Sequence, residues 1–307
     1  MPNPFSMVSW KPTGKLQTTL KSIVQVRGKC LHSGEVSTVT LYPELAARGR
    51  TFRFSHANCS IPATINFVCK SLLCTTLLNE NIRVRTVEHL LSALEGAGVT
   101  NCAIEVLNSN KEDTEFEVPI LDGSSKGWAD EIEKVGIETA VDAAGNHRHT
   151  LAPHLIHPVR VQHKDSFLFA FPSRTTQITY GIDFPRVSAI GNQWFSLPSL
   201  TESSYYEEIA SSRTFCVYEE VESMKKKGLI KGGSLENAIV CSERDGWLNP
   251  PLRYVDEACR HKVLDLVGDL SLFARCGTRG VPVAHIVAYK AGHALHTQFL
   301  RCLERAH

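Results

Sequence analysis

Two residues four positions apart, His261 and Asp265, could bind a divalent metal ion near the C-terminal end of the chain. The apolar residues around them recur at helical spacing, namely Leu264, Leu266, Val267 and Leu270. This pattern predicts a helix over 258–270, on which residues four apart lie on one face. An imidazole nitrogen and a carboxylate oxygen so placed can share an ion. The alternative is a solvated surface pair.

A second candidate ligand, His89, lies far upstream and directly follows Glu88. Thr86 could cap a helix there, and Gly96 or Gly98 would end it. Adjacent residues on a helix point about 100° apart, so His89 could bind an ion while Glu88 acts as a base on a water beside it. In the alternative interpretation, Glu88 is a helix-start carboxylate favoured by the helix dipole, and His89 is a packing residue.

The composition limits the kinds of function. The chain has 307 residues and is 43% hydrophobic, enough for a large core, which we expect to form two domains. Its formal net charge of +1 gives no field that would recruit nucleic acid or an anionic membrane. No run reaches membrane-spanning length, so a soluble protein is expected. The 10 cysteines lack zinc-finger spacing and are typical of reduced thiols.

The elements that would position these residues follow from the same patterns. Strands are predicted on both sides of a linker at 142–149, where apolar periodicity is lost. They include Cys102–Leu107 before the linker and Gln177–Phe184 after it. The first 34 residues contain no acid, which fits a disordered tail or the remnant of an organelle-targeting segment. A final helix is predicted to begin at Gly292-His293. Either His293 is a general acid there, or it is an ordinary helix-cap residue.

Five of these motifs, in order, resemble one known family. They are Thr86-Val87-Glu88-His89-Leu90, Ser212-Arg213-Thr214-Phe215, Gly232-Gly233-Ser234, the run from His261 to Asp269, and Gly292-His293-Ala294-Leu295. Together they resemble the UDP-3-O-acyl-N-acetylglucosamine deacetylases, the zinc amidases of lipid A biosynthesis. The resemblance runs from about Leu20 to the final helix. The amino-acid sequence of Ser212–Glu220 is similar to that of the plant members.

The resemblance implies an α+β fold of two similar domains, each a β-sheet layer with helices, the helices packed between the two sheets. The expected units are a tail at 1–17, a first domain at 18–145, and a second domain at 150–307. An insert at about 213–240 would form the acyl-chain passage. The active site is expected where the two domains meet.

The resemblance also implies the roles of the residues. One Zn²⁺ would be held by His89, His261 and Asp265, with one position open for water. Glu88 would be the general base and His293 the general acid. The remaining catalytic roles fall to Asp269, which would orient His293, Thr214, which would donate to the oxyanion, and Lys262, which would offer charge to the diphosphate.

Substrate-binding residues follow from the same resemblance. Asp183 and Phe184 match the region that holds the uridine, and Phe215 and Lys262 are further expected substrate-binding residues. The acyl passage would be lined by Val217, Val221, Ile230 and Ala238. His157 stands where a lysine is common, so its substrate contact is left open. We expect a monomer acting on an acylated UDP-amino sugar, in the mitochondrion or alternatively in the cytoplasm. The competing hypotheses are an amidase for another N-acetyl sugar and a homologue that only binds lipid or nucleotide.

Overall fold

A computed structural model describes residues 6–54, 59–108 and 114–305 of the chain. Two five-stranded sheets form its outer layers. The first sheet has the order β3 (Val24–Lys29), β4 (Val36–Pro43), β10 (Cys102–Leu107), β5 (Arg50–Phe54) and β6 (Cys59–Pro62). The second has the order β14 (Val159–His163), β15 (Ser166–Pro172), β21 (Ala284–Tyr289), β16 (Gln177–Phe184) and β17 (Gly191–Leu197).

The two sheets have the same topology. In each, the last strand in sequence is inserted between the second and the third, and it pairs antiparallel with the second and parallel with the third. The parallel pairs are β10 with β5 and β21 with β16. A helix precedes the inserted strand in each half, α1 (Glu88–Gly96) in one and α5 (Glu257–Leu270) in the other. The molecule is therefore built from two similar α+β units, as expected.

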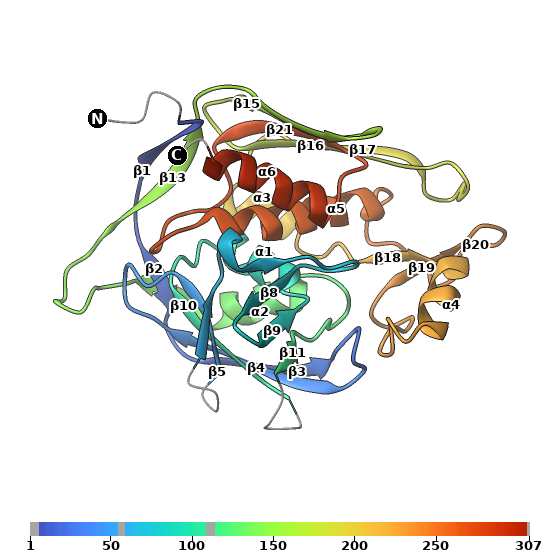
Figure 1. Cartoon of the computed structure of the whole chain (residues 1–307), viewed down its shortest axis with the longest axis horizontal. Helices are drawn as coiled ribbons and strands as arrows, with labels where there is room; N and C mark the ends of the chain where they lie inside the picture. The colour runs from blue at the N-terminus through green and yellow to red at the C-terminus, as the bar shows by residue number, and fades with distance from the viewer. Residues whose placement is uncertain (1–5, 55–58, 109–113, 306–307) are drawn as a thin grey trace.

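The helices pack between the two sheets (Figure 1). α1 and α5 lie against each other there. The same layer also contains α2 (Lys126–Val135), α3 (Glu202–Glu208) and α6 (His293–Arg305). Every residue of α1 is buried, although the helix carries two glutamates and a histidine. A helix that is buried on all sides places polar residues inside the molecule, where they need partners.

A glycine allows α1 and α5 to approach closely. A β-carbon placed on Gly268 of α5 would lie 2.1 Å from the main-chain oxygen of Glu88. Only glycine fits such a contact, because real β-carbons are not found so near a carbonyl oxygen. The first turn of α1 therefore rests directly on the main chain of α5.

Smaller sheets complete the fold. A four-stranded sheet in the first half contains β11 (Glu115–Glu117), β9 (Ile82–Arg85), β8 (Thr76–Asn79) and β7 (Val68–Cys69). A three-stranded sheet in the second half contains β18 (Phe215–Val217), β19 (Ile239–Ser242) and β20 (Gly246–Trp247), with α4 (Tyr218–Lys226) between its first two strands. This second sheet and α4 project from one side of the molecule (Figure 1). Two single-turn 3₁₀ helices span Ile65–Phe67 and Ser271–Phe273.

Two predictions from the sequence are wrong in detail. The segment 1–17 was expected to be a tail, but β1 (Val8–Leu16) pairs antiparallel with β13 (His149–Leu155), and residues 1–5 lie outside the described part. A short pair, β2 (Thr18–Leu20) with β12 (Ile137–Thr139), follows it. Thr86 does not cap α1: its φ is 57°, and its hydroxyl donates to Glu117 instead. Strand pairing across 133 or more residues is not visible in local sequence patterns.

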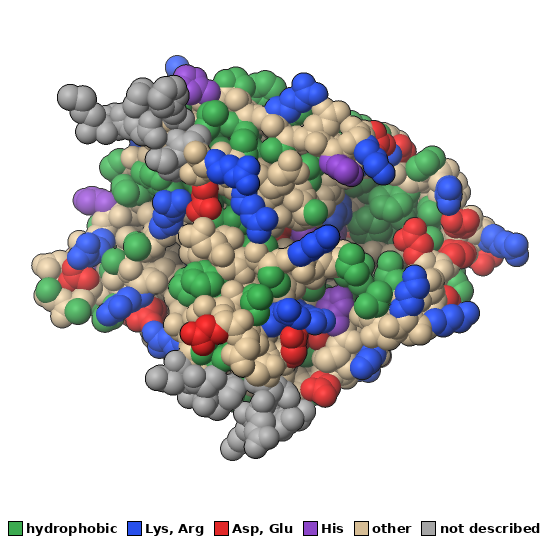
Figure 2. Space-filling view, in the orientation of Figure 1, with side chains coloured by type: hydrophobic (Ala, Val, Ile, Leu, Met, Phe, Trp, Pro, Cys, Tyr) green, Lys and Arg blue, Asp and Glu red, His purple; other side chains and the backbone are tan. Residues whose placement is uncertain are grey.

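The surface carries charges of both signs, consistent with the formal net charge of +1. Acidic and basic side chains are interspersed over the face seen in Figure 2. In the part of the chain that the structure describes, no helix combines the length and apolar character that crossing a bilayer requires. The 10 cysteines are all described, and each is a free thiol.

Candidate active site

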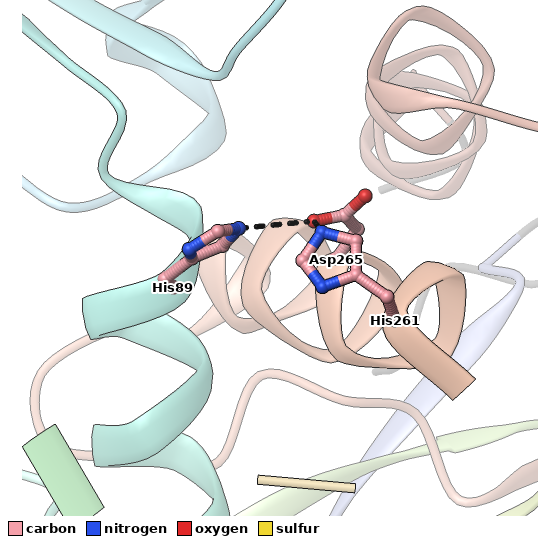
Figure 3. A group of neighbouring side chains, drawn as sticks. All are labelled: His89, His261 and Asp265. Carbon is pink, nitrogen blue, oxygen red and sulfur yellow. Dashed lines mark ion pairs between the residues drawn. The ribbon is translucent and has the colours of Figure 1, made fainter. Parts of the chain in front are cut away.

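The helix pair α1 and α5 brings three candidate metal ligands together. His89 comes from the first turn of α1, while His261 and Asp265 lie one turn apart on α5, and the three point toward one another (Figure 3). One ligand atom from each lies within 4.8 Å of the others. Asp265 Oδ1 is 3.5 Å from His89 Nε2 and 3.3 Å from His261 Nε2. All three residues are buried.

The three side chains fit a zinc ion. Two ligand atoms about 2.0 Å from a tetrahedral zinc lie about 3.3 Å apart, close to the two separations at Asp265. His261 Nδ1 is 3.0 Å from the main-chain oxygen of Ser212, so this nitrogen carries the proton and Nε2 presents its lone pair. His89 Nδ1 is buried and has no hydrogen-bond partner among the described residues. Two imidazoles and one carboxylate are a typical catalytic zinc set.

The charge states of His261 and Asp265 also suit a metal. Burial lowers the pKa of His261 to about 4, so its ring is neutral near pH 7. Burial opposes ionisation of Asp265, but Lys262 and His261 outweigh it and hold the pKa of this carboxyl well below its ordinary value. A neutral imidazole and an ionised carboxylate are the forms that bind metal ions.

Groups that can donate or accept protons lie beside this triad. His293 Nε2 is 3.8 Å from Glu88 Oε1 and 4.0 Å from Asp265 Oδ2. Its other nitrogen, Nδ1, lies 2.7 Å from Asp269 Oδ2. Thr75 joins the two carboxylates, because its N–H donates to Glu88 Oε2 at 3.0 Å and its hydroxyl donates to Asp269 Oδ1 at 2.5 Å. Glu88 and His293 therefore face each other beside the ligand atoms.

The pKa values of Glu88 and His293 are both raised, by burial in the first case and by nearby negative charge in the second. Burial raises the pKa of Glu88 well above its ordinary value, although His293 opposes this. Burial alone would lower the pKa of His293, but Asp269, Asp265 and Glu88 outweigh it and raise the pKa to about 10. A histidine that stays protonated at neutral pH can donate a proton to a leaving group. A pocket that pairs a carboxyl with an imidazolium has the parts of a general base and a general acid.

Comparison with known proteins identifies the family. The family described as UDP-3-O-acyl N-acetylglycosamine deacetylase matches residues 17–305. The chain belongs to this deacetylase family. It is 58% identical over 296 residues, 96% of this chain and 90% of the relative, to the probable mitochondrial UDP-3-O-acyl-N-acetylglucosamine deacetylase 1 of Arabidopsis thaliana.

Bacterial members of the deacetylase family are more distant. The UDP-3-O-acyl-N-acetylglucosamine deacetylase of Trichormus variabilis is 44% identical over 286 residues, which cover 92% of this chain and 96% of the relative. The deacetylase of Thermosynechococcus vestitus is also 44% identical, over 289 residues that cover 94% of this chain and 93% of the relative. The similarity therefore spans both halves of the fold and all of the site residues.

Of two further residues predicted from the family resemblance, Lys262 contacts the triad directly and Thr214 is linked to it through the neighbouring main chain. Lys262 Nζ is 2.5 Å from Asp265 Oδ2, and this ion pair is mostly buried. Thr214 is held by its main chain, which accepts from Ile239 N–H at 2.8 Å and donates to the oxygen of Gly123 at 2.7 Å. It is two residues from Ser212, whose carbonyl contacts His261. The charge of Lys262 is thus directed at the carboxylate of Asp265.

The predicted substrate-binding residues form two groups. Phe184, at the end of β16, makes an edge-on contact with Phe215 of β18, with ring centroids 5.3 Å apart. Asp183 is 3.6 Å from Lys290 Nζ. The predicted acyl-passage residues lie in and around the projecting unit of α4 and its sheet: Val217 and Ala238 are buried, and Val221 and Ile230 are half-buried. His157 lies in an exposed turn after β13.

Sequence reasoning missed two residues that contact the site. One is Thr75, whose contacts with Glu88 and Asp269 depend on the tertiary fold. His296 lies three residues after His293 on α6, and its Nδ1 is 2.7 Å from Asp269 Oδ2. The His293–His296 spacing was the available signal, because residues three apart share a helix face.

Proposed function

We propose that this chain hydrolyses the N-acetyl amide of UDP-3-O-acyl-N-acetylglucosamine to give acetate and UDP-3-O-acyl-glucosamine. This reaction is an early committed step of lipid A biosynthesis. The observation that carries the proposal is the convergence of His89, His261 and Asp265 beside the facing pair Glu88 and His293. The proposed substrate is taken from the description of the deacetylase family to which the chain belongs.

Zinc is the proposed cofactor, bound as a single ion by His89, His261 and Asp265. When bound, it supplies a Lewis acid that polarises the amide carbonyl and lowers the pKa of water. The donor set supports this assignment, since two imidazole nitrogens and one carboxylate oxygen leave room for one further ligand. The proposed division into units 18–145 and 150–307 places ligands on both sides of the junction.

The remaining residues of the site move protons and stabilise charge. In the proposed mechanism, Glu88 takes a proton from the attacking water, and His293 Nε2 gives a proton to the leaving amine. Asp269 holds the other ring nitrogen of His293 at 2.7 Å, which fixes the ring and favours its protonated form. The Thr214 hydroxyl is proposed to donate to the developing oxyanion, and Lys262 to offer charge to the diphosphate of the substrate.

The substrate would extend from the site in two directions. Phe184 and Phe215 form an aromatic corner that can stack on a uracil ring, with Asp183 next to it as an acceptor. The acyl chain is assigned to the passage lined by Val217, Val221, Ile230 and Ala238. Each methylene buried there would contribute about 0.8 kcal/mol, enough for acyl length to affect affinity.

The place of action is proposed from the plant relatives. Those relatives are named as mitochondrial proteins, and we propose the same compartment for this chain, with the cytoplasm as the alternative. We keep the expectation of a monomer as a prediction. A fluorescent fusion of the full chain expressed in plant cells, imaged beside a mitochondrial marker, distinguishes the two compartments.

Mass spectrometry of the reaction tests the proposed function. The purified protein is incubated with synthetic UDP-3-O-acyl-N-acetylglucosamine and, separately, with free N-acetylglucosamine, with and without a zinc chelator. We expect acetate loss from the acylated nucleotide sugar alone, abolished by the chelator and restored by zinc. Equal hydrolysis of free N-acetylglucosamine would indicate an amidase for another sugar, and binding of the substrate without turnover would indicate a non-catalytic homologue.

A further inference from the structure

A chain of buried polar groups continues behind Asp269, away from the substrate side. His296 Nδ1 lies 2.7 Å from Asp269 Oδ2, the same oxygen that His293 Nδ1 approaches at 2.7 Å. On its other side, His296 Nε2 is 3.1 Å from the hydroxyl of Tyr180. His296, Tyr180 and Asp269 are all 0% exposed. The mechanism proposed above uses neither His296 nor Tyr180.

The chemistry of the groups assigns the protons in this chain. Burial opposes ionisation of Asp269, but His293 and His296 outweigh it and lower the pKa of Asp269, so it is a carboxylate that only accepts hydrogen bonds. Both histidines must therefore present Nδ1–H to the same oxygen. Burial lowers the pKa of His296, although Asp269 opposes this.

Tyr180 anchors the far end of the chain. Its hydroxyl lies 2.8 Å from the main-chain oxygen of Ala291, two residues before His293, and 3.1 Å from His296 Nε2. Burial raises the pKa of this phenol well above its ordinary value, so it stays protonated. Tyr180 belongs to β16, and Ala291 lies in the turn that leads into α6. One hydroxyl thus contacts both the ring behind Asp269 and the segment that carries His293.

We propose that His296, held by Tyr180, is a positioning residue that fixes the Asp269 carboxylate for the general acid His293. The inference rests on the proposed function, because it assigns a role in that same reaction. Thr75 donates to Oδ1 of Asp269, while His293 and His296 donate to Oδ2. A carboxylate oxygen bonded only to the ring that it orients can move with that ring, whereas a second donor on the same oxygen holds it in place independently. Without His296, Oδ2 would be bonded only to His293 and would no longer fix that ring, although every residue proposed to touch the substrate is intact.

Three variants test the role. His296→Leu removes the donor, and His296→Asn restores an N–H at the same number of bonds from the main chain. Tyr180→Phe removes only the outer hydroxyl. An exposed histidine of β14 supplies the matched control, His163→Leu. We expect His296→Leu to lower kcat about 10- to 100-fold with little change in KM or zinc content. His296→Asn should recover most of the loss, Tyr180→Phe should give a smaller loss, and His163→Leu should match the wild type.

A readout independent of activity separates this inference from the proposed function. Proton NMR of the zinc-loaded protein with ¹⁵N-labelled histidine should show downfield Nδ1–H signals from His293 and His296, in addition to that of His261. Loss of the His296 signal and a shift of the His293 signal in His296→Leu would support the hydrogen-bond chain even if the wild type left the substrate intact, an outcome that would refute only the proposed function. If His296→Leu turned over like the wild type, or if His296→Asn were as impaired as His296→Leu, the positioning role would be wrong.

Discussion

Glu88 and His89 are neighbours in the chain, yet their side chains face different groups. The carboxylate of Glu88 meets Thr75 N–H and His293, whereas the ring of His89 approaches Asp265. The separation follows from helix geometry, because adjacent side chains point about 100° apart. One residue can therefore bind the ion while the other reaches a water next to it.

This separation predicts different outcomes for two substitutions. Glu88→Gln keeps the shape of the side chain but removes the base, so we expect an unchanged zinc content and a loss of kcat of about 10²- to 10⁴-fold. His261→Ala removes a ligand and should lose both zinc and activity. Metal analysis and kcat measured on the same preparations check the pair, with the exposed His149→Ala as control. Near-normal turnover by Glu88→Gln would show that another group is the base.

Sequence reasoning at this scale found the residues with strong chemical types. His261 and Asp265 could be paired from spacing alone, and His89, Glu88 and His293 were candidates from their places at helix starts. The family resemblance then implied their roles and that of Asp269. Sequence reasoning missed Thr75 and His296, whose roles depend on distances to Asp269 that tertiary packing sets. A threonine next to a cysteine carries no local signal for a contact with a residue almost 200 positions away.

At the scale of elements, the site depends on how closely α1 approaches α5. Gly268 has no side chain where the main chain of Glu88 passes, and the three ligands come from these two helices. Nearby, the Ser92 hydroxyl donates to the main-chain oxygen of Leu264 at 2.8 Å, a second link between the helices. Small changes in the helix separation would therefore change the ligand distances directly.

Gly268→Ala should separate the helices. The new methyl group would meet the main chain of Glu88 rather than a flexible side chain, so the helices must shift. We expect a destabilisation of about 1–3 kcal/mol from overpacking and a weaker affinity for zinc. Chemical denaturation and a competitive zinc titration measure the two effects. Gly127→Ala on α2 is the control, because its nearest neighbour, at 3.0 Å, is a movable methyl group of Leu121. Wild-type zinc affinity in Gly268→Ala would contradict this account of the helix contact.

The helices were predicted well because their apolar periodicity is strong, and α5 begins within one residue of the expected position. The strand β1 was not predicted. It carries Pro12, Gly14 and two lysines, a composition that resembles a tail, and it becomes a strand only through its partner β13. The repeated sheet order was also invisible, because it is a property of pairing rather than of residue types.

At the scale of the whole molecule, a buried carboxylate ties the two halves together. Glu95, at the end of α1, is 2.6 Å from Arg50 Nη2 in the first half. Its other oxygen accepts from Arg279 at 3.1 Å and from the N–H of Gly280 at 3.1 Å, both in the second half. Burial opposes ionisation of Glu95, but the two arginines outweigh it and lower its pKa from 4.5 to about 2.

This carboxylate predicts how stability depends on pH. A folded-state pKa below the unfolded one stabilises the protein fully above pH 4.5, and the contribution is lost as pH falls from about 4.5 toward 2. The difference corresponds to about 3 kcal/mol. Glu95→Gln should therefore be less stable than the wild type at pH 6, and the gap should narrow toward pH 3. Urea denaturation across this range measures it, and a gap that stayed constant with pH would refute the ionic role of Glu95.

The central claim is that two helices from different halves of the chain hold one zinc ion with two imidazoles and one carboxylate. X-ray absorption at the zinc edge of the metal-loaded protein tests it most directly. We predict only nitrogen and oxygen neighbours at about 2.0–2.1 Å with the scattering of two imidazole rings in the wild type, and loss of this zinc environment in His89→Ala. A sulfur neighbour at about 2.3 Å, or a zinc environment unchanged in His89→Ala, would contradict the claim.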